Sequence, residues 1–359
     1  MMTVMPFFIA VVLAFAGALS YGEAPPPPCA LICLSTRQDG EDHVGSCSRH
    51  RHAVLDGSPV IPYIDSHTHM HSLPWDAWEL LGMCGMQAAV ISAGTPYLSR
   101  SVRTEVPGPS EIEDLWRQPI QLARTAPREL LFRLSVSIGI SHATRVRDWE
   151  KLLEKMPAYF QDPLVVAVGE MGLDPFQVWG MTWSLEEQEE VLKGQLQVAK
   201  VHGKPFILHT PSPRKGALIG GGPTLPEELT RSCLERDLRA VEAVGFPQER
   251  LVVDHCDAAT LAFVLKETGA YAGISVGLAI REIGPQDVAE MVIRHGPDRI
   301  LLNSDLVAYT SCDVLGLPAS LRAMRRLGLP LKQIRRAAFE NANTFYGLCL
   351  AVPPITDES

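Results

Sequence analysis

From Ile61 onward the chain alternates short apolar runs, rich in β-forming residues, with longer stretches of helical pattern. This alternation constrains the fold more than any other feature. Eight such runs occur, at residues 62–66, 88–94, 131–138, 165–170, 205–209, 251–256, 271–276 and 300–305. Eight consecutive βα units predict an α/β fold, a closed parallel TIM-like (β/α)8 barrel, which needs roughly 250 residues. The 359 residues, 46% of them hydrophobic, suffice for one such barrel and an N-terminal extension.

The stretches between the runs carry recognisable helix signals. Ser184 followed by Glu187 resembles a capping box, in which each residue bonds the backbone N–H of the other. Apolar residues then recur at mostly helical spacing until Gly203 and Pro205 interrupt the pattern. We therefore expect a helix between the fourth and fifth runs.

The first 58 residues differ from the rest of the chain. Residues 5–19 are almost continuously apolar and are followed by small residues of the kind that a signal peptidase reads, so residues 1–22 are expected to be a signal or targeting segment. The missing Lys or Arg at its start leaves a signal anchor or a misplaced translation start open. Residues 23–58 are Pro-rich and polar, which predicts a disordered linker, and residues 59–359 are expected to form the barrel. Without a targeting signal the expected location is cytoplasmic.

Two histidines, His67 and His69, stand two positions apart at the end of the first run. In an extended chain alternate side chains share a face, so both imidazoles can bind one ion. The ends of four later runs carry the other residue types of a hydrolytic metal centre, namely Glu170, His209, His255 and Asp305. The C-terminal ends of all strands in a parallel barrel meet at one face. A packing role explains any one histidine, but six such residues on five strands favour a metal centre.

The same residues stand in an ordered set of motifs. These are DSHTH at 65–69, GEMGLD at 169–174, PFILH at 205–209, DHC at 254–256, SD at 304–305 and NANTFYG at 341–347. As a set they resemble the TatD family of metal-dependent hydrolases, from about Tyr63 to about Leu348. The resemblance implies an amidohydrolase-type barrel that holds one or two divalent ions, zinc, magnesium or manganese. It also implies hydrolysis of phosphodiester bonds, often as a deoxyribonuclease that digests DNA from its 3′ end.

Coordination chemistry assigns roles within this resemblance. His67 and His69 are expected to bind a first ion through neutral nitrogens. Glu170 can span two ions through its two carboxylate oxygens, and His209 and His255 would hold the second. The predicted centre therefore holds one or two ions, with Glu170 shared where both are bound.

Asp305 and Glu170 are the predicted catalytic residues. Asp305 can touch the first ion and accept the proton of an activated water, or it can serve as a ligand only. A glutamate rather than a lysine at position 170 favours the TatD-like branch over relatives whose ions share a carboxylated lysine. Asp65 either supports a neighbouring ligand or simply ends a strand.

The chain departs from the family pattern in the loops beside the predicted centre. After His209 it carries Arg214 and Lys215 followed by three glycines, and the two basic residues either contact a substrate phosphate or form an exposed turn. Residues 175–176 replace the usual aromatic position, and the segment after Asp305 lacks the usual proline-rich turn. These differences bear on nuclease activity more than on hydrolysis. Three further histidines are expected to be solvent or packing residues: His71, His142 and His202.

The net charge and the cysteine spacing limit the possible substrates and structural motifs. A net charge of -9 and a pI near 5.7 argue against a broad nucleic-acid-binding surface, so a small molecule or single-stranded nucleic acid is the expected substrate. Eight cysteines without a C-x-x-C pair imply neither a zinc ribbon nor a disulfide framework. Two alternatives stay open: a metal-dependent hydrolase of a small ester, lactone or amide, and a metal-binding barrel without catalysis. The oligomeric state is not set by the sequence.

Overall fold

The computed structural model describes residues 60–94, 106–126, 129–143, 145–175, 183–211, 227–276, 283–306 and 313–352. These belong to one compact unit, Pro59–Ser359. The predicted targeting segment and linker lie outside the described residues. None of the helices in the described ranges combines the length and the hydropathy that a membrane span requires.

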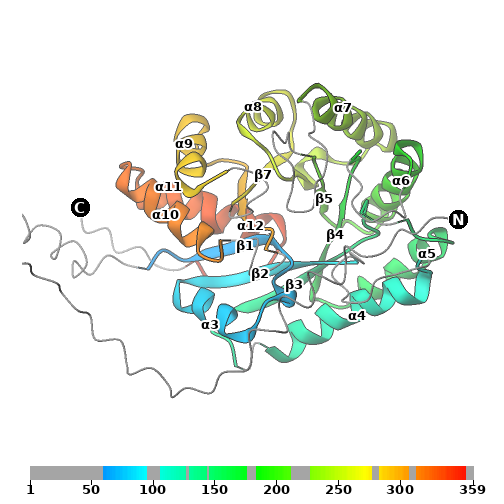
Figure 1. The fold of residues 1–359 in the computed structure, drawn as a ribbon, viewed down its shortest axis with the longest axis horizontal. Helices are drawn as coiled ribbons and strands as arrows, with labels where there is room; N and C mark the ends of the chain where they lie inside the picture. The colour runs from blue at the N-terminus through cyan, green and yellow to red at the C-terminus, as the bar shows by residue number, and fades with distance from the viewer. Residues whose placement is uncertain are drawn as a thin grey trace, which may run out of the picture. The chain divides into compact units, whose positions relative to one another are not determined.

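Eight parallel strands form one sheet in the order in which they occur along the chain (Figure 1). The strands are β1 (Tyr63–Thr68), β2 (Met86–Ala93), β3 (Arg133–Ile138), β4 (Val165–Met171), β5 (Phe206–Leu208), β6 (Leu251–Val253), β7 (Tyr271–Ser275) and β8 (Ile300–Asn303). Every run predicted from the sequence overlaps one of them. The predicted (β/α)8 architecture is therefore confirmed.

The first strand and the segment after the last strand bring the two edges of the sheet together. The backbone N–H of Asp305 donates to the His67 carbonyl at 3.0 Å, and the backbone N–H of His69 donates to the Leu306 carbonyl at 3.0 Å. The Ser66 hydroxyl donates to the Leu302 carbonyl at 2.9 Å. The barrel is thus nearly closed, and this junction places the first histidine pair beside Asp305.

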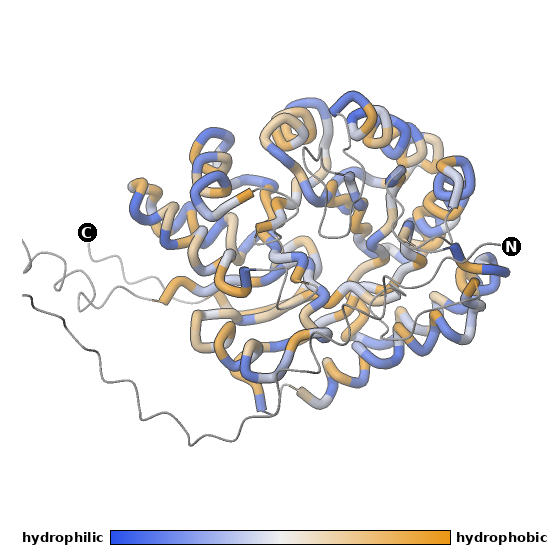
Figure 2. The backbone as a smooth tube through the Cα atoms, viewed as in Figure 1, coloured by the Kyte–Doolittle hydropathy of each residue, from blue (hydrophilic) through white to orange (hydrophobic). Residues whose placement is uncertain are grey.

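Helices follow each strand and surround the sheet (Figure 1). They are α3 (Trp75–Met83), α4 (Pro109–Thr125), α5 (Glu150–Tyr159), α6 (Leu185–Val201), α7 (Glu227–Val244), α8 (Ala258–Glu267), α9 (Pro285–His295) and α10 (Gly316–Arg326). Short turns of 3-10 helix, η1 (Met70–Ser72) and η4 (Gln248–Arg250), follow β1 and precede β6. The chain continues through α11 (Leu331–Arg335), the π-helix η5 (Arg336–Glu340) and α12 (Asn341–Phe345). Hydrophilic and hydrophobic residues alternate along the helical tubes in Figure 2, as expected for helices with one face on the sheet.

The predicted helix between the fourth and fifth strands is α6. Ser184 is its N-cap and accepts a hydrogen bond from the Glu187 N–H at 3.1 Å, while the Glu187 carboxylate accepts one from the Ser184 N–H at 2.8 Å. This reciprocal pair is the capping box expected from the sequence. It fixes where α6 begins, just after the loop that follows β4.

Apolar residues fill two regions of the barrel. A large cluster packs between the sheet and the helices, and it includes Tyr63 and Ala89. The residues next to them in sequence, Ile64 and Ala88, belong to a separate cluster because alternate strand residues face opposite sides of a sheet. This second cluster fills the inside of the barrel toward the N-terminal ends of the strands. Aromatic residues of the C-terminal helical region pack against it, which covers that end.

Candidate metal centre

Glu170, the penultimate residue of β4, lies at the centre of four imidazoles. Its Oε1 lies 3.1 Å from His69 Nε2 and 3.7 Å from His67 Nε2. Its Oε2 lies 3.0 Å from His209 Nδ1 and 3.2 Å from His255 Nε2. The two oxygens thus face two different pairs of histidines, which is the division expected from the sequence.

The outer nitrogens of the first histidine pair are held by groups that fix their protons. His67 Nδ1–H donates to Asp254 Oδ2 at 2.6 Å, and His69 Nδ1–H donates to the Ser92 carbonyl at 3.2 Å. Since a carbonyl oxygen only accepts, the proton of His69 is on Nδ1. In each ring the other nitrogen, Nε2, points toward Glu170 and can bind a cation. Carboxylates and carbonyls commonly orient metal-binding histidines in this way.

The second histidine pair is held by an equivalent arrangement. His209 uses the opposite ring nitrogen, because its Nε2–H donates to Asp174 Oδ2 at 3.1 Å and leaves Nδ1 facing Glu170. His255 Nδ1 lies 2.6 Å from the Ser275 hydroxyl oxygen, and its Nε2 faces Glu170. All four inner nitrogens therefore converge on one carboxylate.

Buried carboxylates give this centre a strong demand for positive charge. Burial lowers the pKa of His67, but the charge of Glu170 and the bond to Asp254 outweigh it and raise the pKa to about 10. Burial likewise lowers the pKa of His209, and its bonds to Asp174 and Glu170 raise it to about 9. Burial raises the pKa of Glu170, but the His67 charge and the histidine bonds hold it well below its usual value. A divalent cation would meet the same demand.

The donor atoms fit such a cation. Atoms bound to one ion at about 2.1 Å lie roughly 3.0–3.4 Å from one another, close to the separations of 3.0–3.7 Å around Glu170. Two groups of candidate ligands result, His67 with Glu170 and His255, and His67 with His69 and Asp305. The His67 Nε2 atom is buried and has no hydrogen-bond partner among the described residues. Such an atom is costly to bury unless something binds it.

Asp305 lies beside both histidine pairs. Its Oδ1 is 3.5 Å from His69 Nε2, and its Oδ2 is 3.8 Å from His255 Nδ1. The preceding residue, Ser304, donates from its backbone N–H to Asp65 Oδ1 at 3.0 Å and from its hydroxyl to Asp65 Oδ2. Asp65 therefore lies within β1 and anchors the segment that carries Asp305, so it does not end the strand.

Two glycines allow the backbone and side chains of the centre to approach closely. Gly169 has φ of 118°, and a Cβ on it would lie 2.5 Å from the Ile207 carbonyl oxygen of β5. A Cβ on Gly273 would lie 2.1 Å from Asp254 Oδ1. Both positions require glycine because any side chain would collide with neighbouring strand atoms. They let β4 deliver Glu170 and let Asp254 reach His67.

The structure brings together the six residues selected from the sequence: His67, His69, Glu170, His209, His255 and Asp305. His142, expected to be a solvent or packing residue, is buried and stacks on His209 with ring centroids 3.7 Å apart, so it packs directly beside a predicted ligand. Burial and the neighbouring His209 lower the pKa of His142 to about 3. His202 is exposed and packs on Phe160, as expected. Arg214 and Lys215 lie outside the described residues.

Sequence reasoning gave no role to Asp174, Asp254 and the helix residues Gln188 and Gln195. Asp174 and Asp254 stand inside the quoted motifs, but their bonds to histidines on distant strands follow only from the folded geometry. The two glutamines did leave a signal. They are polar residues within the apolar stripe of α6, and both are fully buried.

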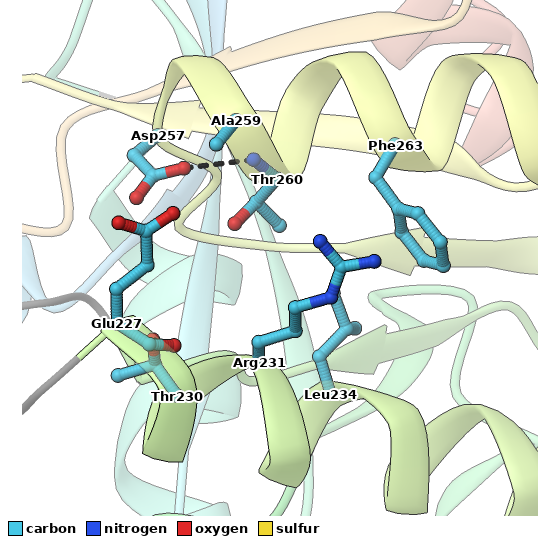
Figure 3. Close-up of a pocket in the computed structure, with 8 residues that line it drawn as sticks. All are labelled: Glu227, Thr230, Arg231, Leu234, Asp257, Ala259, Thr260 and Phe263. Carbon is cyan, nitrogen blue, oxygen red and sulfur yellow. Dashed lines mark hydrogen bonds between the residues drawn. The ribbon is translucent and has the colours of Figure 1, made fainter.

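A separate pocket, lined by none of these histidines, lies between α7 and α8 (Figure 3). Its lining residues are Glu227, Thr230, Arg231, Leu234, Asp257, Ala259, Thr260 and Phe263. The Asp257 carboxylate accepts a hydrogen bond from the Thr260 N–H at 2.8 Å, which caps α8, and the Arg231 guanidinium lies 5.5 Å from the centre of the Phe263 ring. None of these lining residues is a histidine or cysteine. The residues around Glu170 therefore remain the candidate metal centre.

Comparisons with known proteins agree with this geometry. An uncharacterized metal-dependent hydrolase of Methanocaldococcus jannaschii is 24% identical over 285 residues, which cover 79% of this chain and all of that protein. Among solved structures, the phosphotriesterase homology protein of Escherichia coli, with phosphate in its active site, superposes with a TM-score of 0.53 at 17% identity. The match covers 80% of this chain and 99% of that one.

A β-aspartyl dipeptidase of Fervidobacterium islandicum AW-1 also has a TM-score of 0.53, at 14% identity over 80% of this chain and 73% of its own. At such low identities the two structures support the fold alone. The sequence model of the family described as TatD related DNase matches residues 64–347, which contain all six candidate residues and the eight strands except the first residue of β1. The chain therefore belongs to the TatD family and is a metal-dependent hydrolase of that family.

Proposed function

We propose that this protein hydrolyses phosphodiester bonds with two divalent cations bound on either side of Glu170. The observation that carries the proposal is the arrangement of Glu170, whose two oxygens face two different pairs of imidazole nitrogens: one pair from β1 and its end, and the other from the ends of β5 and β6. A paired-cation centre is well suited to phosphoryl transfer, because one cation can stabilise the attacking oxygen and the other the leaving oxygen. The description of the matching family as a DNase supports the same substrate class.

The proposed ligands fall into two sets that share Glu170. His67, His69 and Asp305 would hold the first cation, and His209 and His255 the second. When bound, the cations would polarise the phosphoryl group and lower the pKa of a water molecule. The donor set of nitrogens and carboxylates suits zinc or manganese, and magnesium fits the carboxylates better than the imidazoles.

Asp305 is the proposed general base. Its carboxylate lies within 3.5–3.8 Å of histidines from both sets and is 5% exposed, so it faces the same space as the proposed ligands. The bond from its own N–H to the His67 carbonyl holds its backbone against β1. A carboxylate held in this position can accept a proton from the attacking water.

The substrate proposed is the 3′ end of single-stranded nucleic acid. The net charge of -9 disfavours a duplex bound along a broad surface, whereas a single strand end can reach a recessed centre. The alternative is a small ester, lactone or amide, which the same water activation would hydrolyse. The deep burial of the centre, with Glu170 at 4% exposed, suits a strand end or a small molecule better than a bulky duplex.

A substrate panel tests the proposal. The full-length protein, stripped of metal and supplied separately with Mn²⁺, Mg²⁺ or Zn²⁺, is assayed on a single-stranded DNA oligonucleotide, bis(p-nitrophenyl) phosphate, a lactone and a dipeptide. We expect cation-dependent hydrolysis of the two phosphodiesters, lost in Glu170→Gln. The matched control is Glu190→Gln, the same change on the exposed face of α6, which should keep full activity. Turnover of only the lactone or the dipeptide would establish the alternative, and no turnover of any substrate would indicate a non-catalytic barrel.

A further inference from the structure

A third cluster of metal-binding residue types lies on the far side of His209 from Glu170. It consists of His142, in the loop after β3, Asp174, in the loop after β4, and His209 itself, all buried. The rings of His142 and His209 stack at 26°. Asp174 Oδ2 lies 3.1 Å from His209 Nε2 and 4.0 Å from His142 Nε2. The proposed binuclear centre uses neither His142 nor Asp174 as a ligand.

The positions of His142 and Asp174 are fixed by one face of α6. The Gln188 side chain accepts from the Asp174 N–H at 2.8 Å and donates to the Asp174 carbonyl at 3.0 Å. Gln195, two helical turns later, accepts from the Ile140 N–H at 2.8 Å and donates to the Ile140 carbonyl at 3.0 Å. Each glutamine thus bonds both backbone groups of one loop residue. Two fully buried amides hold the two loops in a fixed relation.

A further bond holds the loop that carries His142. The Trp183 indole N–H, just before α6, donates to the Ser141 carbonyl at 3.3 Å. His142 is therefore preceded by two residues whose backbone groups are bonded to the α6 region. These hydrogen bonds hold the loop more rigidly than an ordinary surface connection, as is expected for a loop that positions a functional side chain.

One nitrogen of the His142 imidazole is without a partner in the described part of the chain, and the other faces Asp174. His142 is 7% exposed, and its Nδ1 atom is buried without a hydrogen-bond partner among the described residues. Its Nε2 atom faces Asp174 across 4.0 Å, which is too long for a hydrogen bond. Two donor atoms at that separation can both bind one cation, because bonds of about 2.0–2.2 Å on either side span it.

We propose that His142 Nε2 and the Asp174 carboxylate bind a third divalent cation. The inference rests on the proposed function, since the third cation would lie beside the pair around Glu170. His209 links the two sites without binding both cations, because it donates from Nε2 to Asp174 and faces Glu170 through Nδ1. Two protein ligands leave several coordination positions for water and for the phosphoryl oxygens of a substrate. The third cation therefore binds more weakly than the other two.

Counting bound Mn²⁺ tests this inference without an activity assay. Metal-stripped full-length protein is titrated with Mn²⁺, and free Mn²⁺ is measured by electron paramagnetic resonance. We expect three Mn²⁺ per chain, the third at least about tenfold weaker than the first two because it has two protein ligands. His142→Ala and the better-filling His142→Gln should each bind two. The matched control is His202→Ala, which removes an exposed imidazole that packs on Phe160 and should leave three.

The outcomes separate this inference from the proposed function. Saturation of the unmodified protein at two Mn²⁺ would overturn the third site and leave the binuclear centre intact. Three Mn²⁺ in both His142 variants would overturn the ligand assignment. An unmodified protein that binds no Mn²⁺ would overturn the proposed function as well. If His142→Ala fails to fold by circular dichroism, the count for the unmodified protein and for His142→Gln still decides.

Discussion

The two ends of the barrel interior are built from the same strands but carry different side chains. The inward-facing residues are apolar toward the N-terminal ends of the strands and polar at the next inward-facing position. On β2 the inward-facing Val90 is followed two residues later by Ser92, whose hydroxyl accepts from the Glu170 N–H at 3.3 Å. On β8 Leu301 is followed by Asn303, whose amide donates to Asp254 Oδ1 at 2.7 Å. Alternate residues of a strand share a face, so both members of each pair line the interior.

The two ends of the barrel interior therefore serve different purposes, one for stability and the other for reactivity. The N-terminal end is lined mainly by apolar residues and packs against Phe345 and Tyr346, so its burial contributes mainly to folding. The C-terminal end holds buried carboxylates and imidazoles that satisfy one another. We therefore expect substitutions at the two ends to have separable effects, one set on hydrolysis and the other on unfolding.

The largest effect on hydrolysis is expected for Glu170→Gln. The amide keeps the shape but removes the negative charge between both cation positions, so metal occupancy and rate should fall together. A loss of about 5 kcal/mol of transition-state stabilisation corresponds to about ten-thousandfold in kcat/KM. Steady-state kinetics and elemental analysis of the same preparations check this. Normal metal content with normal activity would show that Glu170 does not bridge.

Asp305→Asn should have the next largest effect. It keeps an oxygen donor but removes the group proposed to accept the proton, so kcat should fall by about a hundredfold to ten-thousandfold with metal content nearly retained. Parallel measurement of kcat and metal content separates the two roles. A variant that loses metal but regains activity in excess metal would make Asp305 a ligand only.

Asp254→Asn should weaken the centre less. Asp254 accepts from His67 Nδ1 and from Asn303, and its pKa is lowered because charge on His255 and the bond to His67 outweigh burial. Loss of such an outer partner typically reduces metal affinity or activity about 10–100-fold. Calorimetric titration with Zn²⁺ measures the change. An unaltered affinity would mean that Asp254 only packs against β7.

Leu301→Ala tests the role of the apolar N-terminal end of the barrel interior. Removing this buried side chain should lower the free energy of unfolding by about 2–5 kcal/mol, while hydrolysis at a temperature where the protein stays folded changes little. The matched control, Leu327→Ala at a half-exposed position, should change stability by less than about 0.5 kcal/mol. Urea unfolding followed by circular dichroism compares the two. A large loss of activity without destabilisation would remove the distinction between the two ends.

The smallest effect is expected from removing residues 1–58. The described barrel begins at Val60, and both ends of its interior are formed by later residues. The truncated protein should therefore unfold and hydrolyse substrate as the full chain does. Thermal unfolding and kinetics of the two proteins test this, and an insoluble truncation would give the first residues a structural role.

The sequence predicted the barrel because each strand leaves an apolar run between helix signals, but it did not set the ends of those runs. The first run, expected at 62–66, is a strand that extends to Thr68, so His67 lies inside β1. The sixth run, expected at 251–256, ends as a strand at Val253. Both differences between the predicted and observed strand ends lie next to the candidate metal centre. There the length of a strand depends on its bonds to other strands, which the local sequence pattern does not reveal.

The centre could be predicted to the extent that its residues end consecutive strands. The position of His142 beside the centre was not predicted, because His142 follows β3 by four residues in a loop without any periodic pattern. The hydrogen bond between His67 and Asp254 was not predicted, because it joins residues 187 positions apart. Such contacts depend on strand register and barrel closure, which no local feature of the sequence encodes.

The position of bound metal tests the central claim most directly. Crystals of the full-length protein grown with Mn²⁺ are measured on both sides of the manganese absorption edge, so that anomalous difference density locates each ion. We predict two strong peaks, one beside each carboxylate oxygen of Glu170, with His67 and His69 at one and His209 and His255 at the other. Absence of any peak near Glu170, or manganese bound only elsewhere on the barrel, would contradict the account.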